Sequence, residues 1–363
     1  MNQSDGSFRV LSARDPLESA AWTHLWQSWP NREVFAHPNY VKLFAREHDQ
    51  PLCACWTLAE DKVLYPFVLR DLSREPYWTA AIGPAADIVS PYGYGGPFFC
   101  GSGNPNELER SFWLAFDAWA RSKSVVSEFI RCSLFSDDLL PYPGTLKEDR
   151  KNVVRDLQLD EHALWMDFKH KVRKNVSKAR RSALRVEADF TGESLAEFIR
   201  IYESTMRRRD AREEYFFSRS FFESLQEGLP GQFAYFNVIL NRRVVSTELV
   251  LISSRTVYSF LGGTDEAVFD LRPNDLLKYE IMLWAMNHRK SHFVLGGGYQ
   301  AEDGIYRYKA AFAPRGSVAY RVGYRTLSEE TYKKLLVAKK RIAEEEGRVW
   351  QPARDYFPAY RAA

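Results

Sequence analysis

The sequence contains no apolar run of about 18 residues, which is the length that a transmembrane helix needs. Its first ten residues, MNQSDGSFRV, are polar and lack the apolar segment of a secretory signal. We therefore expect a cytoplasmic protein that has no membrane span.

Cysteine is scarce, with four residues at positions 53, 55, 100 and 132. Cys53 and Cys55 form a C-x-C on a predicted strand, with no C-x-x-C and no histidine nearby. This spacing predicts no metal site and favours buried, reduced thiols.

Net charge is also small. The chain has 50 Lys and Arg against 47 Asp and Glu, so only a local patch could attract nucleic acid. The hydrophobic fraction of 45% and charged fraction of 27% are those of an ordinary globular protein. A length of 363 residues indicates about two domains.

The first half reads as two helices followed by a hairpin of two strands, an opening typical of α+β proteins. Helices are expected over 16–30 and from Pro38 onward, where Lys42 is exposed. After the hairpin comes Asp87–Phe99, DIVSPYGYGGPFF, in which glycine and proline exclude a regular strand. Tyr92, Tyr94 and Gly95 could hold a planar or sugar-like ligand; alternatively, the segment is a kinked loop between core strands. A helix up to Lys123 and a strand over 125–135 complete this half.

The second half repeats this order of elements without repeating the sequence. We therefore predict an α+β protein with mixed sheets and two domains, residues 1–160 and 161–363, the second including a C-terminal helix capped by Ser328. The polar residues 136–151 are expected to carry the crossing between the domains.

Residues 168–187 form the most basic segment of the chain. Val172, Val176, Ala179 and Ala183 share one face of a predicted helix, and no acid occurs between Lys169 and Arg185. Such a one-signed helix favours a polyphosphate or nucleic-acid partner, although a solvated face gives the same pattern.

The segment His292–Phe312, HFVLGGGYQAEDGIYRYKAAF, combines a short buried strand, three glycines, a polar turn and a lysine among aromatics. Glycines allow close approach of a ligand or a second backbone. Lys309 could supply a cation to a phosphate or a developing oxyanion. The alternative is a strand, a tight turn and a solvated lysine.

Four segments together resemble the Fem family of aminoacyltransferases within the GNAT acyltransferase superfamily. They are KVRKNVSKARRSALRVE, YSFLGGT, PNDLLKYEIMLWAM and FVLGGGYQAEDGIYRYKAAF, and the likeness covers about residues 165–325. The resemblance implies two tandem GNAT-like domains and transfer of an aminoacyl group from aminoacyl-tRNA to an amine. It also implies that Lys309 is the active-site lysine, that Tyr308 is the aromatic residue before it, and that Lys42 contacts the diphosphate of the acceptor.

The donor can be argued from the junction GGTDEAVFDLRPNDLL. GNAT enzymes hold the pyrophosphate of coenzyme A with a glycine-containing loop at a helix N-terminus. This junction has no such glycines near the helix start, and Pro273 removes one amide. Aminoacyl-tRNA is therefore the expected donor and no cofactor is expected; an acyl-CoA co-substrate, or a binding module that needs no Lys309, remains an alternative.

In the expected reaction, an amine of a small molecule or cell-envelope precursor attacks the donor carbonyl to form a peptide-type bond. Lys309 would offset the oxyanion, and Asp303 is the nearest candidate base, unless it is only a turn residue. The remaining candidates fall into two groups. Substrate-binding residues are Lys42, Tyr92, Tyr94, Gly95, Thr264, Gly297, Tyr299, Tyr306 and Tyr308; donor-binding residues are Lys174, Lys178 and Arg181.

Overall fold

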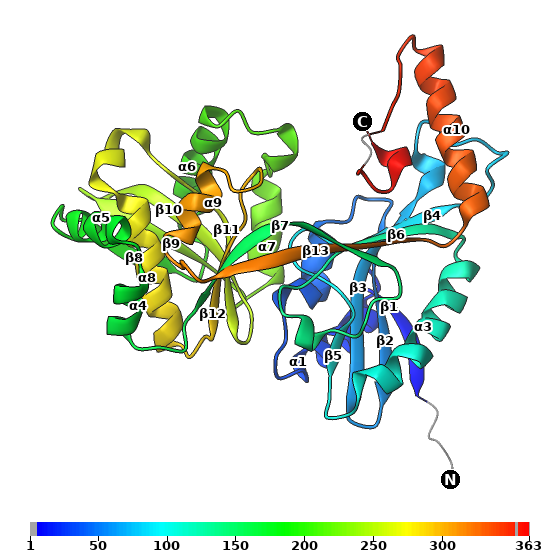
Figure 1. The fold of residues 1–363 in the computed structure, drawn as a ribbon, viewed down its shortest axis with the longest axis horizontal. Coiled ribbons are helices and arrows are strands. Elements are labelled where there is room, and N and C mark those ends of the chain that lie inside the picture. The colour runs from blue at the N-terminus through cyan, green and yellow to red at the C-terminus, as the bar shows by residue number, and fades with distance from the viewer. Residues whose placement is uncertain (1–5, 353–354, 363) are drawn as a thin grey trace. The chain divides into compact units, whose positions relative to one another are not determined.

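The computed structural model describes residues 6–352 and 355–362. By their internal contacts these residues form two compact units. Unit 1 contains residues up to 30, 35–149 and 320 onward, and unit 2 contains 31–34 and 150–319. Figure 1 shows the course of the chain through both. Among the described residues, no helix is long and apolar enough to cross a membrane.

Unit 1 is built on a mixed sheet in the order β1-β2-β3-β4-β6-β13, with β5 paired to β3. Among the described strands of this sheet, only β4 and β6 run parallel, and α3 connects them. Its elements are β1 (Ser7–Ser12), α1 (Pro16–Gln27), α2 (Pro38–Leu43), β2 (Gln50–Leu58), β3 (Asp61–Asp71), β4 (Ala86–Val89), β5 (Phe98–Cys100), α3 (Pro105–Ser122), β6 (Val125–Arg131), β13 (Ser317–Thr326) and α10 (Glu329–Glu345).

Unit 2 repeats this plan with the order β7-β12-β11-β10-β9-β8. Here β11 and β12 are the parallel pair, and α8 connects them. Its elements are β7 (Thr145–Asp156), α4 (Glu161–Asp167), α5 (His170–Arg180), β8 (Arg185–Asp189), α6 (Leu195–Arg208), α7 (Arg219–Gly228), β9 (Phe233–Leu240), β10 (Arg243–Ile252), β11 (Thr256–Thr264), α8 (Pro273–Asn287), β12 (His292–Gly296) and α9 (Gly304–Ala310).

Short 3-10 helices complete the secondary structure. They are η1 (Val34–Ala36), η2 (Leu72–Arg74), η3 (Ser136–Asp138), η4 (Glu213–Tyr215), η5 (Glu266–Leu271) and η6 (Ala359–Arg361). The predicted α+β class with two tandem domains of one plan is thus confirmed.

Alternation along the strands explains why each sheet is covered on both faces. In unit 2, Ala234 and Phe236 face the core that contains α5 and α8, whereas Tyr235 packs on Phe198 of α6. Successive side chains of a strand point to opposite faces, so both faces bury apolar residues. Figure 1 shows α4, α5 and α8 on one side of the strands and α6 and α7 on the other.

The C-terminal segment belongs to unit 1, whereas the sequence placed it in the second domain. β13 pairs antiparallel with β6, and Leu335 of α10 and Tyr360 pack on Leu72 and Val126. β7, which follows β6 along the chain, instead pairs with β12 of unit 2. The last strand of each half of the chain thus pairs with a strand of the other half. The order of strands in the sequence does not predict this exchange, because an apolar pattern does not show which strands pair.

Two element boundaries also differ from the prediction. The basic helix ends at Arg180, because Ala183 adopts a left-handed conformation with φ of 54° and β8 begins at Arg185. The polar stretch 136–151, expected to be turns, contains the first half of β7.

Candidate functional site

The parallel strands β11 and β12 pair only over three residues, Thr256–Tyr258 with His292–Val294. Beyond this point β11 continues to Thr264, whereas β12 ends at Gly296. The backbone of β11 is therefore unpaired with β12 at the carboxyl ends of the two strands. Ligand sites of α/β sheets commonly occur at such ends, where parallel strands part.

The two glycines after β12, Gly297 and Gly298, pass close to other backbone and side-chain atoms. A Cβ on Gly297 would lie 2.4 Å from Asn152 Oδ1 and 3.0 Å from the carbonyl oxygen of Lys151, and one on Gly298 would lie 2.2 Å from Asp303 Oδ1. Glycine is required at both places by close approach. The turn that contains Gly297 and Gly298, which we call the glycine turn, therefore lies directly against β7 at Gly297.

Asp303 organises the turn that follows. Its Oδ2 accepts hydrogen bonds from the backbone N–H of Tyr299 (2.7 Å) and Gln300 (3.0 Å), and its Oδ1 caps α9 through Tyr306 N–H at 2.8 Å. Partial desolvation opposes ionisation, but these backbone N–H groups lower the pKa of the carboxyl below its usual value. An ionised cap with three donors is a poor proton acceptor, so its geometry fits the turn alternative better than the base.

Lys309 lies on α9, a helix that the sequence pattern did not indicate. Its ammonium donates a hydrogen bond of 2.7 Å to the carbonyl oxygen of Gly297. Burial, and next the positive charge of Lys278, lower the pKa of Lys309 to about 8, although Glu248 and Asp303 oppose this shift. Lys309 therefore sits at the parting strands and titrates close to neutral pH.

Lys278 and Glu248 form a buried ion pair that sequence reasoning missed. Lys278 lies on α8 and Glu248 on β10, and the ammonium donates to both carboxylate oxygens at 2.5 Å and to Ser259 Oγ at 2.9 Å. One signal was available: Glu248 is the single charge in the strand segment VVSTELVLI, and Lys278 directly follows two buried leucines in PNDLLKYEIM. Charged residues are rarely buried unless they are paired.

The other predicted residues of this motif divide into buried and exposed groups. Tyr306 is buried and its hydroxyl bonds Ser317 Oγ, Thr264 is buried and bonds Ser246 Oγ, and the half-buried Tyr308 accepts from Asn274. These three side chains are held by the protein itself. Tyr299, by contrast, is 51% exposed and its hydroxyl accepts from Arg212 Nε at 2.8 Å.

We call Arg208, Phe269, Arg212 and Tyr299 the Arg–aromatic rim. The guanidinium of Arg208 lies 4.8 Å from the ring centroid of Phe269 and donates to the Thr264 carbonyl, at the end of β11. Phe269 is 41% exposed. The rim thus follows the ends of β11 and β12, where Lys309 also lies.

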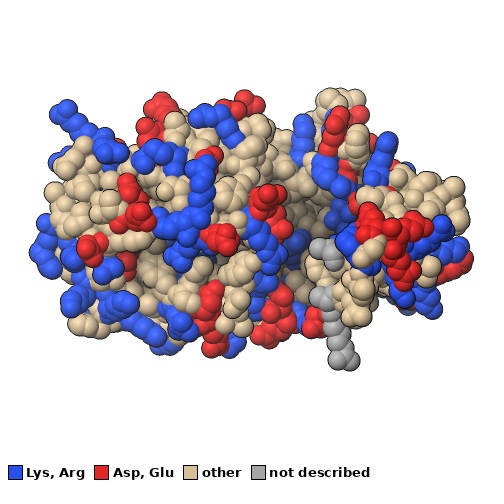
Figure 2. Space-filling model, turned by 90° about the horizontal axis from the view of Figure 1, so that it is seen from above, with Lys and Arg blue, Asp and Glu red and all other residues tan. Residues whose placement is uncertain are grey.

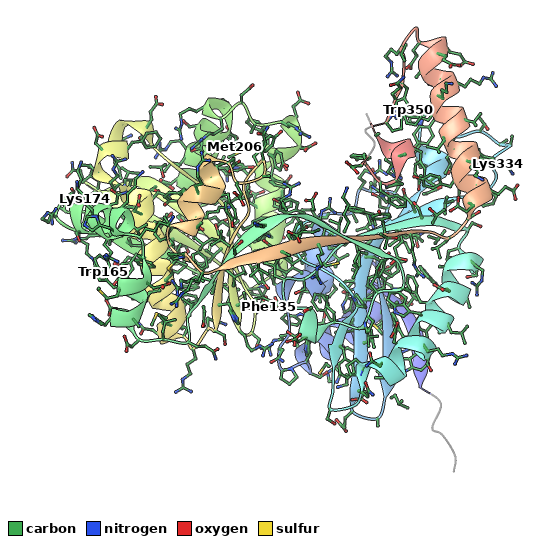
Figure 3. All side chains as sticks on the ribbon, in the orientation of Figure 1. Phe135, Trp165, Lys174, Met206, Lys334 and Trp350 are labelled. Atoms are coloured by element: carbon green, nitrogen blue, oxygen red, sulfur yellow. The ribbon has the colours of Figure 1, made fainter. Side chains whose placement is uncertain are left out.

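Donor-binding candidates lie on α5. Lys174, Lys178 and Arg181 are exposed, and no ion pair involving them is present among the described residues. Two other cations of this segment have structural partners: Arg173 donates to the carbonyls of Met166 and Phe168, and Arg180 stacks on Tyr279. Figure 3 shows Lys174 pointing away from the body of unit 2. Figure 2 shows that Lys and Arg on the visible face are interspersed with Asp and Glu.

The unit 1 candidates lie on α2 and on the loop after β4. Lys42 is exposed. Tyr92 is 42% exposed and stacks on Phe44 with ring centroids 6.1 Å apart, whereas the half-buried Tyr94 packs between Phe35 and Tyr320. The backbone of Gly95 is bonded to Arg131 and Ser133, which ties the loop to the end of β6.

A separate surface hollow of about 720 Å³ lies at the opposite edge of the unit 2 sheet. It is lined by β8, the start of α6 and the β9–β10 turn, including Glu187, Glu197, Arg200 and Arg243. None of the predicted site residues lines it. Its mixed charges favour no ligand class.

Comparison with known proteins assigns the class. Residues 167–310 match the family model described as "Acetyltransferase (GNAT) domain", which confirms the acyltransferase class. No curated protein sequence matches the chain.

Solved structures then give the nearer likeness. The chain resembles FemX with a TM-score of 0.65 and 13% identity, over 88% of this chain and 98% of FemX. It also resembles the C-terminal domain of a putative lysylphosphatidylglycerol synthetase from Agrobacterium fabrum (TM-score 0.54, 12% identity, 90% and 97% covered) and L-PGS from Bacillus licheniformis (0.53, 11%, 93% and 99%). The predicted likeness to Fem-type proteins is thus confirmed for the fold.

Proposed function

We propose that this protein is an aminoacyltransferase that moves an aminoacyl group from aminoacyl-tRNA to an amine of a small-molecule or cell-envelope precursor. The observation that carries the choice of donor is the start of α8, the helix that connects the parallel strands. The fold of the protein and its resemblance to FemX support the reaction class.

The N-terminus of α8 is unsuited to a pyrophosphate. The helix begins at Pro273, which has no N–H, after Arg272 in a left-handed conformation. Asp275 occupies the first turn; burial raises the pKa of its carboxyl, while Asn175 Nδ2 donates to it at 3.0 Å. A carboxylate at this place competes with phosphate oxygens for the free amides and repels them when ionised.

The Arg–aromatic rim and α5 carry the kinds of side chain that would bind the end of a tRNA. Unpaired bases stack on exposed aromatic rings and guanidinium groups, and phosphates bind exposed lysine and arginine. The rim supplies two exposed rings, each with an arginine beside it. Because the rim follows the ends of β11 and β12, a nucleotide bound there would bring its ester towards Lys309.

The proposed chemistry needs positioning and one cation. The acceptor amine attacks the ester carbonyl, and Lys309 stabilises the oxyanion of the tetrahedral intermediate. Tyr92 and Tyr94 are proposed to line the acceptor site, and Lys42 to contact an acceptor phosphate. Asp303 positions Lys309 by fixing the glycine turn.

An acyl-CoA-dependent N-acyltransferase is the second candidate, because the matched family model describes acetyltransferases. A donor screen separates the two. Purified protein would be offered charged tRNA or acyl-CoA with mixed amine acceptors, and products read by mass spectrometry. We expect products heavier by an aminoacyl residue. Tight acetyl-CoA binding by calorimetry, with no tRNA shift in gels, would overturn the tRNA proposal.

A further inference from the structure

The buried pair of Lys278 and Glu248 has no adequate explanation in stability. The two side chains are 7% and 3% exposed. All three ammonium protons of Lys278 are accepted, two by Glu248 and one by Ser259. Desolvation of two charges commonly cancels their attraction, so an apolar pair at this place would hold the fold equally well.

The pair contacts the two strands, β11 and β12, whose carboxyl ends form the candidate site. The ammonium of Lys278 is 5.8 Å from the ring centroid of Phe293 on β12, the strand that leads into the Gly297 carbonyl to which Lys309 donates. Ser259 of β11 fixes the same ammonium at the strands' parting edge. The ammonium of Lys278 is thus held against both β11 and β12, the strands that part at the site.

The charged groups that act on Lys309 come from three elements. Lys278 on α8 opposes its protonation, whereas Glu248 on β10 and Asp303 before α9 favour it. Together with burial, their net effect lowers the pKa of Lys309 to about 8. A lysine with a pKa near ambient pH can both accept and return a proton.

We propose that the Lys278–Glu248 pair prepares Lys309 to carry the proton in the transfer reaction, with Lys278 and Glu248 acting as positioning residues through Lys309. This inference rests on the proposed function. As the acceptor nitrogen forms its bond to the donor carbonyl carbon, its proton passes to the neutral amine of Lys309. When the bond from that carbon to the ribose oxygen breaks, Lys309 returns the proton to the departing oxygen.

With this assignment, Lys309 takes the role of general base for which Asp303 was the sequence candidate. Asp303 is engaged by three backbone N–H groups, so its lone pairs are largely occupied. Within the described part of the chain, Lys309 has one hydrogen bond, to the Gly297 carbonyl, and a neutral amine can keep that bond as donor while its lone pair accepts a proton.

The experiment measures proton dissociation from Lys309 directly, without substrate. The full chain is labelled with trace acetic anhydride across a pH series, and the Lys309 peptide is quantified by mass spectrometry. Lys278→Met removes the positive charge and should slow labelling at pH 7.5 about three-fold or more, since half a pKa unit corresponds to that factor. The control, Glu280→Gln on the same helix, exchanges a carboxylate for an amide in an outer ion pair and should leave labelling unchanged.

A second variant keeps the test valid if Lys278→Met folds poorly. Lys278→Met with Glu248→Gln leaves no buried charge and should slow labelling in the same direction but less, because the opposing effect of Glu248 is lost as well. Unchanged labelling in both folded variants would overturn the inference.

Activity then separates this inference from the proposed function. With an accepted donor, kcat/KM should rise as pH rises through about 8, and Lys278→Met should move that rise to higher pH. A kcat/KM that falls through this range would overturn the proton-transfer role and leave Lys309 as a cation. Slowed labelling without transfer from any donor would overturn the proposed function, and with it the proton-transfer role, but not the effect of the pair on Lys309.

Discussion

Lys309 Nζ donates a 2.7 Å hydrogen bond to the carbonyl oxygen of Gly297, so the lysine and the glycine turn form one structural unit. The turn is fixed by Asp303, and Asp303 also caps the helix that carries Lys309. Position and orientation of the ammonium therefore depend on a segment of about a dozen residues between β12 and the end of α9. Its protonation depends also on burial and on Lys278 and Glu248, which lie outside that segment.

Replacement of Lys309 tests the centre of the proposal. Lys309→Met should lower turnover by roughly 10²-fold or more, the usual scale for loss of one oxyanion partner. Lys309→Arg should restore activity only in part, because a planar guanidinium cannot replace a compact ammonium in a tight site. Steady-state kinetics with the accepted donor measures both, and wild-type turnover in the methionine variant would exclude a catalytic lysine.

The same variant has a pH signature in stability. Because the folded-state pKa of Lys309 is lowered to about 8, protonation disfavours folding at lower pH and this cost disappears as pH rises towards the unfolded pKa. The Tm of the wild type relative to Lys309→Met should therefore rise between about pH 8 and pH 10. A Tm difference that is flat across this range would contradict the shifted pKa.

Asp303 offers a matched pair of substitutions that separates cap from base. Asp303→Ala removes the cap of α9 and should cost about 1 kcal/mol of stability. Asp303→Asn retains a side-chain oxygen for Tyr306 N–H but cannot accept a proton. We expect nearly full activity from Asn and reduced stability in Ala, measured by kinetics and thermal unfolding; an inactive, stable Asn variant would make Asp303 the base.

Acidity should also act through Asp303. Its carboxyl has a pKa below the usual value, despite partial desolvation, because backbone N–H groups bind the ionised form. The stability that it contributes is present above the unfolded pKa and is lost as pH falls through the lower, folded value. The Ala variant should therefore lose less stability than the wild type on acidification below about pH 4.

Charge reversal on α5 tests the donor. Lys174→Glu, Lys178→Glu and Arg181→Glu together should weaken tRNA binding and flatten its dependence on salt, since each phosphate contact releases counterions. Reversal of Lys333, Lys340 and Arg341 on α10 makes the same charge change in unit 1 and serves as control. Gel-shift titrations at several salt concentrations measure the slopes, and equal slopes for both triple variants would remove α5 from the donor site.

Hydrophobic periodicity predicted the features that depend on a single element, such as which face of a helix is buried. The buried faces of α5 and α8, through Val172, Val176, Leu277 and Ile281, are as expected. The exchange of β7 and β13 was not predictable, because strand partners far apart in sequence are chosen by the assembled sheet. Lys278 and Glu248 are likewise 30 residues apart in sequence, and their burial is explained only by their pairing in space.

The site was predicted as a motif but not as a geometry. The glycines, Asp303 and Lys309 were all singled out, yet α9 was missed because its seven residues are too few for a helical period to show. Tyr306 and Thr264 were expected to bind substrate, and their hydroxyls instead bond Ser317 and Ser246. Residue type alone does not distinguish a tyrosine that faces a ligand from one that completes a core.

The acceptor loop gives a prediction in unit 1. Tyr92→Ala should raise the acceptor KM with little effect on Tm, because the ring is 42% exposed and contacts Phe44 at the surface. Tyr94→Ala removes a ring held between Phe35 and Tyr320 and should lower Tm as well. Kinetics and thermal unfolding of both variants measure the contrast, and an unchanged KM in a stable Tyr92→Ala protein would make the loop purely structural.

Gly297 and Gly304 provide the sharpest test of the glycine turn, because the same change meets opposite surroundings. A methyl group on Gly297 would lie 2.4 Å from Asn152 Oδ1 and 3.0 Å from the Lys151 carbonyl, whereas one on Gly304 meets nothing within 4 Å. Gly297→Ala must push the turn away from β7 and displace the carbonyl that binds Lys309, at a cost of roughly 1–3 kcal/mol. Gly304→Ala stands in the first turn of α9, where alanine is the better helix former, so stability should hold or rise.

Activity should follow the same division. Displacement of the Gly297 carbonyl moves the ammonium of Lys309, and a misplacement of about 1 Å can reduce turnover by some 10²-fold. We therefore expect Gly297→Ala to lose more activity than its stability loss explains at a temperature where it remains folded, and Gly304→Ala to retain activity. Thermal unfolding and steady-state kinetics, run at a temperature where both variants are folded, measure the contrast. Wild-type turnover in both variants would show that the turn does not position Lys309.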